Sequence, residues 1–414
     1  MSLLVDLSGV QAAQTDIDTI GNNIANVSTN GFKSSTPVFS DIYASSLAGA
    51  AGGASPGLGV NVTSLSQLFT EGTINQTGDP LNVAINGGGF FQLQTSSGIA
   101  YSRDGTFQLN NQGFLVNDTG AEVMGFAPAS GAGGTSSGPL QSLQVSLGNV
   151  AASPTSNLAL NVNLPSTDSA IDTTTTPFSV GNPASYDEST TATVYDSLGV
   201  GRTLTTYFTQ ASGSGTPDQW QTHWQLNNSS GTAVASGAGP TLAFNSTGQL
   251  TSGSGTITVA NLPNGAANLN IALGYTGTTL SNLVFGVNSI TNNGNGAGQF
   301  TGVQISNNGE IQGQYSNGST KDFGTIALAN FANPQGLIPV SNNVWQSSIE
   351  SGQATAGAPG SAGLGTLESG AVEGSNVDLS SQLVNLIAAQ QAYQANVQGI
   401  NVEQQNVQRL LTLQ

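Results

Sequence analysis

Mostly apolar residues recur in alternating steps of four and three at both ends of the chain. Near the N-terminus the steps join Leu3, Leu7, Val10, Gln14, Ile17, Gly21 and Ile24. Near the C-terminus they join Leu379, Leu383, Leu386, Gln390, Tyr393, Val397, Ile400, Gln404, Val407 and Leu411. This spacing predicts one helix at each end, each with a heptad-like stripe that needs a partner. We expect 1–31 and 371–414 to form paired terminal helices that order on assembly, because neither should be stable alone.

Between these ends the period changes from helical to alternating. The segment 102–118 alternates around Asp104-Gly105 and Asn111-Gln112-Gly113, which predicts hairpins, and a matching texture returns at 300–318. Strand-like runs such as TATVYD, TLTTYFTQ, WQTHWQL and GTITVANL continue from about Ala151 to Val287 without a helical pattern. This stretch is typical of an inserted all-β domain.

The predicted fold is therefore mainly β with α-helical termini, and its domains are nested and discontinuous. Coiled-coil-like terminal helices accompany two all-β domains. We expect a linker region at 32–76, which includes the small-residue run Ala44–Gly59. An inner β domain should comprise 77–150 and 288–370, and an inserted outer β domain should comprise 151–287.

Charge is scarce in this chain. Only 7% of its 414 residues are charged, against roughly 25% in an average globular protein, and the formal net charge is −17. The five basic residues are scattered at Lys33, Arg103, Arg202, Lys321 and Arg409. No basic patch is available to bind a phosphate backbone, so we exclude nucleic acid as a partner. Cysteine is absent, which excludes disulfides and thiolate metal sites.

The termini also bear on localisation. The start MSLLVDLSGVQAAQTD has neither a cationic region nor a long apolar run, so no secretory signal peptide is expected there. The uncharged stretch Gln382–Val402 is long enough to span a bilayer, but its many Gln and Asn side chains could not be solvated in hydrocarbon. We therefore expect no membrane insertion.

Candidate catalytic chemistry is weak throughout. GGGFF, at 87–91, lacks the Gly-Lys-[Ser/Thr] ending of a phosphate loop and is better explained as a tight turn before a buried strand. The single histidine, His223, lies in a strand-like run, where a structural role is the commoner one. Acidic pairs such as Asp187 with Glu188 occur in any acidic chain. We predict no enzyme, no cofactor and no metal site.

Four segments resemble the rod and hook proteins of the bacterial flagellum. The first, NNIANVSTNGFK, resembles the family signature that ends the N-terminal helix and matches it through Asn22, Asn23, Ala25, Asn26, Thr29, Gly31, Phe32 and Lys33. The others are GDPLNVAINGGGFFQL at 78–93, NFANPQGLIPVSNNVW at 330–345 and SNVDLSSQLVNLIAAQQAYQAN at 375–396. The chain length and the insert around 186–210 resemble the hook type of subunit more than the shorter rod type.

This resemblance implies a self-assembling, curved and hollow helical polymer outside the cell, which acts as a universal joint between motor and filament. The terminal helices would line its inner tube. The subunit would leave the cell through the flagellar type III export apparatus without a cleaved signal peptide. It would contact further copies of itself, the hook cap protein, the distal rod and the hook–filament junction proteins. A distal-rod-type axial protein and, less favoured, a secreted β-rich adhesin or glycan-binding protein are the alternatives.

The resemblance also implies which residues serve assembly. From the signature these are Asn23, Asn26, Gly31 and Phe32, and from the helical stripes they are Leu3, Leu7, Val10, Ile17, Ile24, Leu383, Leu386, Tyr393, Val397, Ile400, Val407 and Leu411. Asn30-Gly31 suits the left-handed step that closes a helix. The signature's Asn side chains should satisfy the free backbone groups there without charge. We expect charge to be absent wherever the helices are packed away from water.

Overall fold

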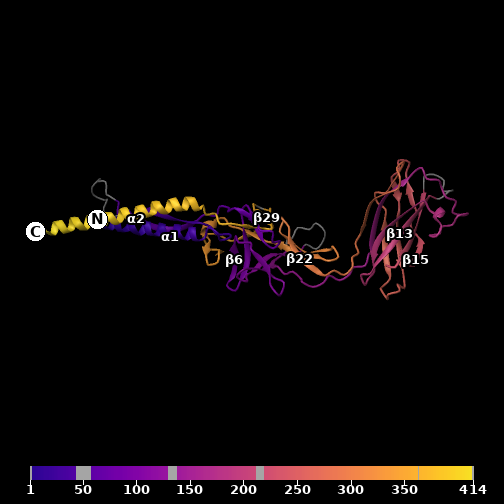
Figure 1. Ribbon diagram of the computed structural model, residues 1–414, viewed down its shortest axis with the longest axis horizontal. Coiled ribbons are helices and arrows are strands. Elements are labelled where there is room, and N and C mark those ends of the chain that lie inside the picture. Colours follow the sequence, from indigo (N-terminus) through magenta and orange to yellow (C-terminus); the bar gives the residue numbers. More distant parts are fainter. Residues whose placement is uncertain (1, 43–56, 129–137, 211–218, 362, 413–414) are drawn as a thin grey trace. The chain divides into compact units, whose positions relative to one another are not determined.

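The structure is a computed structural model that describes residues 2–42, 57–128, 138–210, 219–361 and 363–412 (Figure 1). Within these residues the chain divides into two compact units. Unit 1 comprises 1–147, 302–313 and 321–414, and unit 2 comprises 148–301 and 314–320. The described residues contain two α-helices, one at each end of the chain, and all other long elements are strands. The predicted fold class, mainly β with helical termini, is confirmed.

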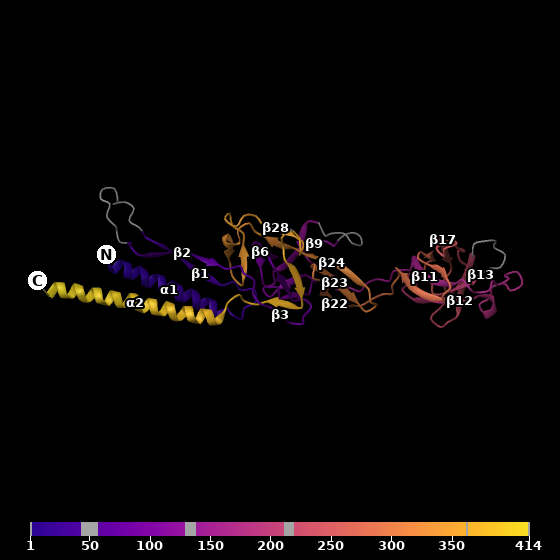
Figure 2. The same cartoon turned by 90° about the horizontal axis from the view of Figure 1, so that it is seen from above.

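The two helices are α1 (Ser2–Ala25) and α2 (Leu379–Thr412). They lie side by side and antiparallel in both views (Figures 1 and 2). Asp378 caps α2, because its carboxylate accepts hydrogen bonds from the backbone N–H groups of Ser380 and Ser381. These hydrogen bonds and one from the Ser381 hydroxyl lower the pKa of Asp378.

A two-stranded hairpin packs against α1. Its strands are β1 (Ser35–Asp41) and β2 (Val60–Gln67), which pair antiparallel. The Ser8 hydroxyl on α1 accepts a hydrogen bond from the Val60 N–H at 3.1 Å. The predicted linker region 32–76 therefore contains a sheet in its described part. The run Ala44–Gly59 lies outside the described residues up to residue 56.

The β body of unit 1 is built on one large sheet and two short antiparallel ribbons. The sheet orders its strands β22-β23-β24-β9-β5-β6-β27-β26 and pairs β10, β25, β28, β7 and β8 beside this path, while β29 pairs with β4 and β3 with β30. The bounds are β3 (Ile74–Gln76), β4 (Val83–Asn86), β5 (Phe90–Thr95), β6 (Gly98–Ser102), β7 (Phe107–Leu109), β8 (Leu115–Asn117), β9 (Glu122–Phe126), β10 (Leu140–Ser142), β22 (Phe300–Ile305), β23 (Glu310–Tyr315), β24 (Thr320–Ile326), β25 (Leu328–Asn330), β26 (Ile338–Pro339), β27 (Val344–Gln346), β28 (Thr355–Gly357), β29 (Thr366–Ser369) and β30 (Ala371–Glu373), with a 3₁₀ turn at Pro334–Gly336.

An aromatic cluster forms part of the core of this body. Phe90, Tyr101, Phe331 and Trp345 are buried together, and their rings meet edge to face. Phe90 and Phe91 open β5 after glycines 87 and 89, which have positive φ. The GGGFF run is thus the tight turn before a buried strand that the sequence indicated. The Trp345 indole N–H donates to Gln67 at 2.6 Å and ties the hairpin to the body.

Unit 2 holds two antiparallel-rich sheets whose inner faces share one apolar core. One sheet orders β18-β19-β11-β20 with β21 on β11, and the other orders β12-β13-β14-β16-β17 with β15 on β14. Trp220, Phe208 and Tyr275 are fully or almost fully buried in the shared core. The bounds are β11 (Asn157–Pro165), β12 (Glu188–Tyr195), β13 (Gly201–Gln210), β14 (Gln219–Asn227), β15 (Ala233–Ala238), β16 (Leu242–Phe244), β17 (Leu250–Ser252), β18 (Ser254–Val259), β19 (Leu269–Gly274), β20 (Thr279–Ser281) and β21 (Gly286–Asn292), with a 3₁₀ turn at Pro183–Ser185.

Two local expectations need correction. Asp104-Gly105 makes no hairpin, because β6 pairs with β5 and β27 whereas β7 pairs with β8. Instead the Asp104 carboxylate accepts from the Thr106 N–H, and Gly105 passes against the Val83 backbone where a Cβ would find no space. The expected boundary at 287/288 also falls inside β21, which pairs with β11 of unit 2. The hairpin predicted around 111–113 is confirmed as β7–β8.

Candidate functional site

Small residues form the contact between the two helices. Asn396 of α2 packs over Gly9, where an added Cβ would lie 2.8 Å from its side chain. Gly399 faces the Asp6 carboxylate, and Asn23 donates a hydrogen bond to Gln382 at 3.4 Å. The deepest positions of α1 include Ala12, Ala13, Thr19, Ile20 and Asn23. Gly and Ala along the contact allow two helices to approach closely.

The predicted stripe of α1 is therefore displaced from the observed contact by about one residue. Val10, Ile17 and Ile24 are half-buried, but Leu3 and Leu7 are 46% and 45% exposed. On α2, the half-buried stripe residues are Leu386, Tyr393, Val397 and Ile400, while Leu383, Val407 and Leu411 are exposed. The prediction placed the seam on the largest apolar side chains, and the structure leaves many of these facing outward. Their role in assembly remains a prediction.

The family signature begins inside α1 and continues past its end. α1 ends at Ala25, six residues before Gly31, so the left-handed glycine does not itself close the helix. A series of turns follows, in which the Asn26 N–H bonds the Asn22 and Asn23 carbonyls. The Asn23 side chain is buried and bonds both backbone groups of Ser35, at 2.9 Å to the N–H and 2.8 Å to the carbonyl. Asn23 thereby fastens the helix to the start of the hairpin.

Gly31 sits where the chain passes against the β body. Its φ is +68°, and an added Cβ would lie 2.5 Å from the Asp104 backbone nitrogen. Its N–H donates to the Glu373 carbonyl at 2.8 Å, which brings the segment after α1 beside the segment before α2. Both the positive φ and the lack of space require glycine here. Phe32, the next residue, is half-buried.

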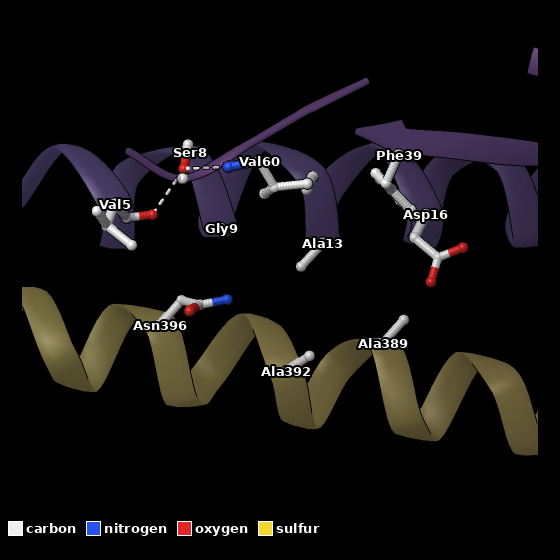
Figure 3. A pocket seen from close by; sticks show the side chains of 12 residues that line it. Val5, Ser8, Gly9, Ala13, Asp16, Phe39, Val60, Ala389, Ala392 and Asn396 are labelled. Carbon is white, nitrogen blue, oxygen red and sulfur yellow. Dashed lines mark hydrogen bonds between the residues drawn. The ribbon is translucent and has the colours of Figure 1, made fainter. Parts of the chain in front are cut away.

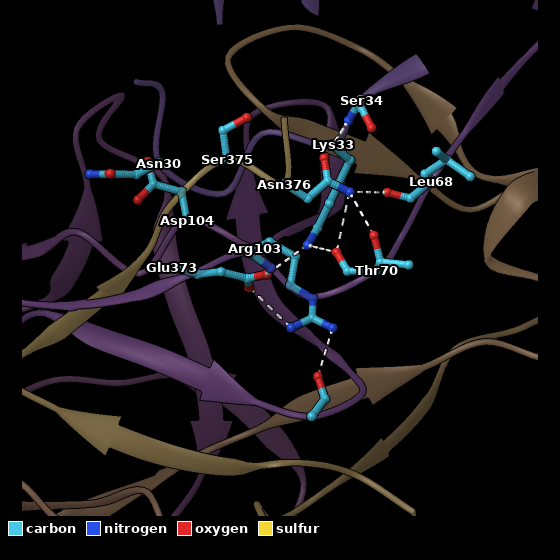
Figure 4. Close-up of polar contacts among 12 residues, drawn as sticks. Asn30, Lys33, Ser34, Leu68, Thr70, Arg103, Asp104, Glu373, Ser375 and Asn376 are labelled. Atoms are coloured by element: carbon cyan, nitrogen blue, oxygen red, sulfur yellow. Dashed lines mark hydrogen bonds and ion pairs between the residues drawn. The ribbon is translucent and has the colours of Figure 1, made fainter. Parts of the chain in front are cut away.

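A buried charge cluster holds the two terminal segments to the body (Figure 4). Lys33 Nζ lies 2.6 Å from Glu373 Oε1, and an Arg103 guanidinium nitrogen lies 3.1 Å from Glu373 Oε2. The side chains of Lys33 and Glu373 are fully buried, and that of Arg103 is 4% exposed. Lys33 also donates to the Thr70 carbonyl, Arg103 to the Gly87 carbonyl, and the Gly72 N–H to Glu373. One carboxylate thus serves two cations from distant parts of the sequence.

The electrostatics of this cluster favour keeping all its members together. Burial lowers the pKa of Lys33, and the neighbouring Glu373 carboxylate opposes that shift by attraction and by its hydrogen bond. Removing one partner from a buried ion pair leaves an uncompensated charge in a low-dielectric site. The charged side chains of the N-terminal segment, the C-terminal segment and the loop after β6 therefore each depend on the others to stay buried. We call this group of side chains the junction cluster.

Asn376 completes the connection on the side of α2. Its side-chain carbonyl accepts from the Ser34 N–H at 2.8 Å, and its amide donates to the Leu68 carbonyl at 2.7 Å and the Thr70 hydroxyl at 3.0 Å. Asn343 reaches Asn30 in the same way, donating to its backbone carbonyl at 2.9 Å. Uncharged amides therefore satisfy much of the backbone at the junction, although Asn343 and Asn376 lie outside the signature for which this was expected.

The absence of charge was expected of the packed helices only, and the segments beside them do carry buried charge. Lys33, Arg103 and Glu373 are among the most buried polar residues described, although only five basic residues exist in the whole chain. Lys33 was visible in the signature, but its partner lies 340 positions away. The rarity of basic residues was the one sequence signal for this cluster. In a chain with only five of them, a lysine inside the signature indicates a specific contact.

The polar groups that the sequence singled out have structural surroundings where they are described. His223 stacks on Phe178 at a centroid distance of 4.0 Å, and burial lowers its pKa. Among the described residues, no group of three or more His, Asp or Glu side chains could hold a metal ion. Neither described helix is long and apolar enough to cross a membrane.

Comparison with known protein families gives four matches in chain order. Residues 3–33 match the flagella basal body rod protein family, and 84–181 match the flagellar hook protein FlgE/F/G D1 domain. Residues 163–295 match the flagellar basal body protein FlaE D2 domain, and 368–413 match the C-terminal family of flagellar basal body rod FlgEFG proteins. Together with the helical termini and the nested β domains, these matches define the class: a rod or hook protein of the bacterial flagellum.

Individual relatives narrow this class. The chain is 39% identical to the flagellar hook protein FlgE of Escherichia coli, covering 98% of both chains. It is 39% identical to the hook protein of Salmonella typhimurium over 100% of both, and 31% identical to that of Borreliella burgdorferi. The chain belongs to the flagellar hook protein family, and it is a structural protein of the flagellar hook that assembles with copies of itself.

The fold has a solved counterpart as well. The crystal structure of Helicobacter pylori flagellar hook protein FlgE2 superposes with a TM-score of 0.55 at 14% identity, covering 71% of this chain and 99% of that one. At this identity the match speaks for the fold alone.

Proposed function

We propose that this chain forms the wall of a curved, hollow hook in which its terminal helices pack around an inner tube and its β domains lie outside them. Such a tube would act as a universal joint that carries motor torque to the filament. One observation carries the proposal: the helix pair exposes large apolar residues along its length. Leu3, Leu7, Leu383 and Leu411 are each 45–68% exposed. Apolar surface of this extent on a helix pair favours burial against further protein.

The assembly residues follow from this arrangement. We propose that the exposed members of the stripes, Leu3, Leu7, Leu383, Val407 and Leu411, contact neighbouring copies. The half-buried members would complete these contacts from within the helix pair. The signature residues Asn23, Asn26, Gly31 and Phe32 would have a different task, since they set the direction in which the helices leave the β body.

The finer partners and the location are part of the same proposal. The subunit would be exported by the flagellar type III apparatus without a cleaved signal peptide and would reside outside the cell. It would add beneath the hook cap protein, on the distal rod at one end of the hook and against the hook–filament junction proteins at the other. Similarity to hook proteins over the full length of both chains supports this assignment.

Assembly of purified subunits tests the proposal. Curved tubes should appear in electron micrographs of the wild-type chain. The triple substitution Leu3→Ser, Leu7→Ser and Leu383→Ser should leave the monomer's far-UV circular dichroism unchanged and abolish the tubes. Leu198→Ser, at a residue of unit 2 that is 59% exposed, is the matched control and should assemble normally. Normal tubes from the triple variant, or straight rigid rods from the wild type, would contradict the proposal.

A further inference from the structure

A groove runs along the helix pair, between α2 and the β1–β2 hairpin, with α1 as its floor (Figure 3). One section has a volume of about 530 Å³, and an adjoining section of about 450 Å³ shares four of its lining residues. The floor is made of small side chains, and Phe39 and Val60 rise from the hairpin on one side. The shared residues are Asp16, Phe39, Ala389 and Ala392.

Among the described residues, Asp16 is the only charged one that lines either section of the groove. Its carboxylate points into the space between the helices, and burial raises its pKa (Figure 3). Within the described residues, no hydrogen-bond donor or basic side chain contacts it. A cation from another molecule would stabilise the charged form of this half-buried carboxylate.

The far end of α2 extends beyond α1. Gly9 contacts Asn396, and Asp6 contacts Gly399. In both pairs the residue numbers add to 405, as expected for two antiparallel helices in a constant register. Ser2, the first residue of α1, is thus opposite about residue 403, since 405 − 2 = 403. The last turns of α2, residues 404–412, have no part of α1 opposite them. We call these residues the tail segment.

The tail segment carries a basic residue and exposed apolar side chains, which complement the acidic and apolar lining of the groove. Val407 is 49% exposed and Leu411 is 68% exposed, so both can be buried against another surface. Arg409, which is exposed, is the only basic residue of either helix. The segment is about 13 Å long at 1.5 Å per residue, whereas the groove runs beside α1 from Val5 to Asn23, about 27 Å. The length of the tail segment therefore fits within the groove.

We propose that the groove of one subunit binds the tail segment of a second copy, with Arg409 beside Asp16 and the apolar side chains against the small residues of the floor. The same subunit cannot fill its own groove, because α2 is a continuous helix that carries its tail segment away from Asp16. This inference rests on the proposed function, since it names the contact by which one subunit of the polymer holds the next.

Cysteine cross-linking tests the contact directly, because the natural chain has no cysteine. One full-length variant carries Ala392→Cys in the groove, and another carries Val407→Cys in the tail segment. The two variants are mixed, assembled and oxidised. A disulfide-linked heterodimer on a non-reducing gel is the expected result, and mixing separate variants ensures that the bond joins different copies.

A third variant, Gln394→Cys, provides the matched control, since Gln394 is exposed on α2 but does not line the groove. It should give at most a small fraction of the cross-link to Val407→Cys. Tubes that form without the heterodimer, or equal cross-linking from Gln394→Cys, would overturn the groove contact and leave the proposed function standing. A wild-type chain that forms no tubes at all would overturn both.

Charge exchange supplies a second measurement. Asp16→Arg and Arg409→Asp should each raise the critical concentration for assembly about tenfold or more, because each places like charges together. The double variant should recover most of that loss if the two residues meet across copies. Losses that simply add in the double variant would contradict the pairing, whatever other contacts Arg409 makes within its own chain.

Discussion

The β sandwich of unit 2 buries its large apolar residues, whereas the terminal helix pair leaves many of its own exposed. In the sandwich, Trp220, Phe208 and Tyr275 face inward and are almost inaccessible to water. In the helix pair, Ala and Gly occupy much of the contact, and leucines such as Leu3, Leu7 and Leu383 are exposed. A domain that buries its own large side chains can fold by itself, whereas a helix pair that buries small ones keeps its strongest apolar contacts for other molecules.

The junction cluster uses a third kind of contact, because it joins the helices to the β body of unit 1 through buried charges rather than apolar burial. Glu373→Gln breaks it and should have the largest effect. Two buried cations would lose their carboxylate, at a cost of about 3–5 kcal/mol. The helical circular dichroism should be lost at lower denaturant concentration. The tryptophans of unit 2, Trp220 and Trp224, should report an unchanged transition in a Trp345→Phe background.

The control for that experiment is a neutral cluster. Lys33→Met, Arg103→Met and Glu373→Leu together should recover part of the lost stability, since no buried charge then lacks a partner. A Glu373→Gln chain whose helices unfold no earlier than those of the wild type would show that the cluster does not couple helices to body.

Gly31→Val tests the same connection through the backbone. A β-branched residue at φ +68° costs of the order of 1–3 kcal/mol in strain, and its Cβ would also meet the Asp104 backbone. We expect assembly into tubes to fail while the β body and unit 2 keep their folded circular dichroism and tryptophan signals. Gly78→Val is a suitable control, because Gly78 also has positive φ but an open environment. Intact tubes from Gly31→Val would show that the junction tolerates rearrangement.

Leu7→Ala should separate monomer stability from assembly. Leu7 is 45% exposed, so its loss should change the monomer's free energy of unfolding by no more than about 0.5 kcal/mol. The critical concentration for assembly should nevertheless rise several-fold. Ile20, in contrast, is only 5% exposed in the helix pair. Ile20→Ala should therefore clearly lower the monomer's free energy of unfolding and change the critical concentration less than that. Equal effects of both variants on the monomer would remove the contrast between inner and outer faces.

The smallest expected effect concerns acid response in unit 2. Burial and the nearby Asp168 raise the pKa of both Asp187 and Glu188. The folded state therefore holds these protons more tightly than the unfolded state, and stability falls as pH rises through this acidic window. Asp168→Asn should lower both pKa values and flatten that dependence. Carboxyl NMR titration measures it, and unchanged pKa values in the variant would refute the assigned cause.

How far the sequence alone predicts this molecule depends on the kind of contact. Periodicity placed both helices and the strands that it named in unit 2, such as β12, β13 and β14, because periods of 3.6 and 2 are local properties of the chain. It misplaced the helix seam, since leucines such as Leu3 and Leu7 carry the strongest apolar signal whether they face a helix or another subunit. The pairing of Lys33 and Arg103 with Glu373 was invisible, because no local pattern connects residues hundreds of positions apart.

The meeting of Gly31 with Glu373 has a consequence for how such proteins vary. Gly31 and Glu373 meet just outside the two helices, so the segment from Lys33 to Val372, whose β1–β2 hairpin also packs along α1, is in effect a single closed loop. Lengthening a loop is thermodynamically mild, with each doubling costing only about 0.6 kcal/mol. The alignment with the Borreliella burgdorferi relative spans 451 positions against 414 residues here. Insertions within this segment should therefore cost little stability and leave the meeting of its two ends in place.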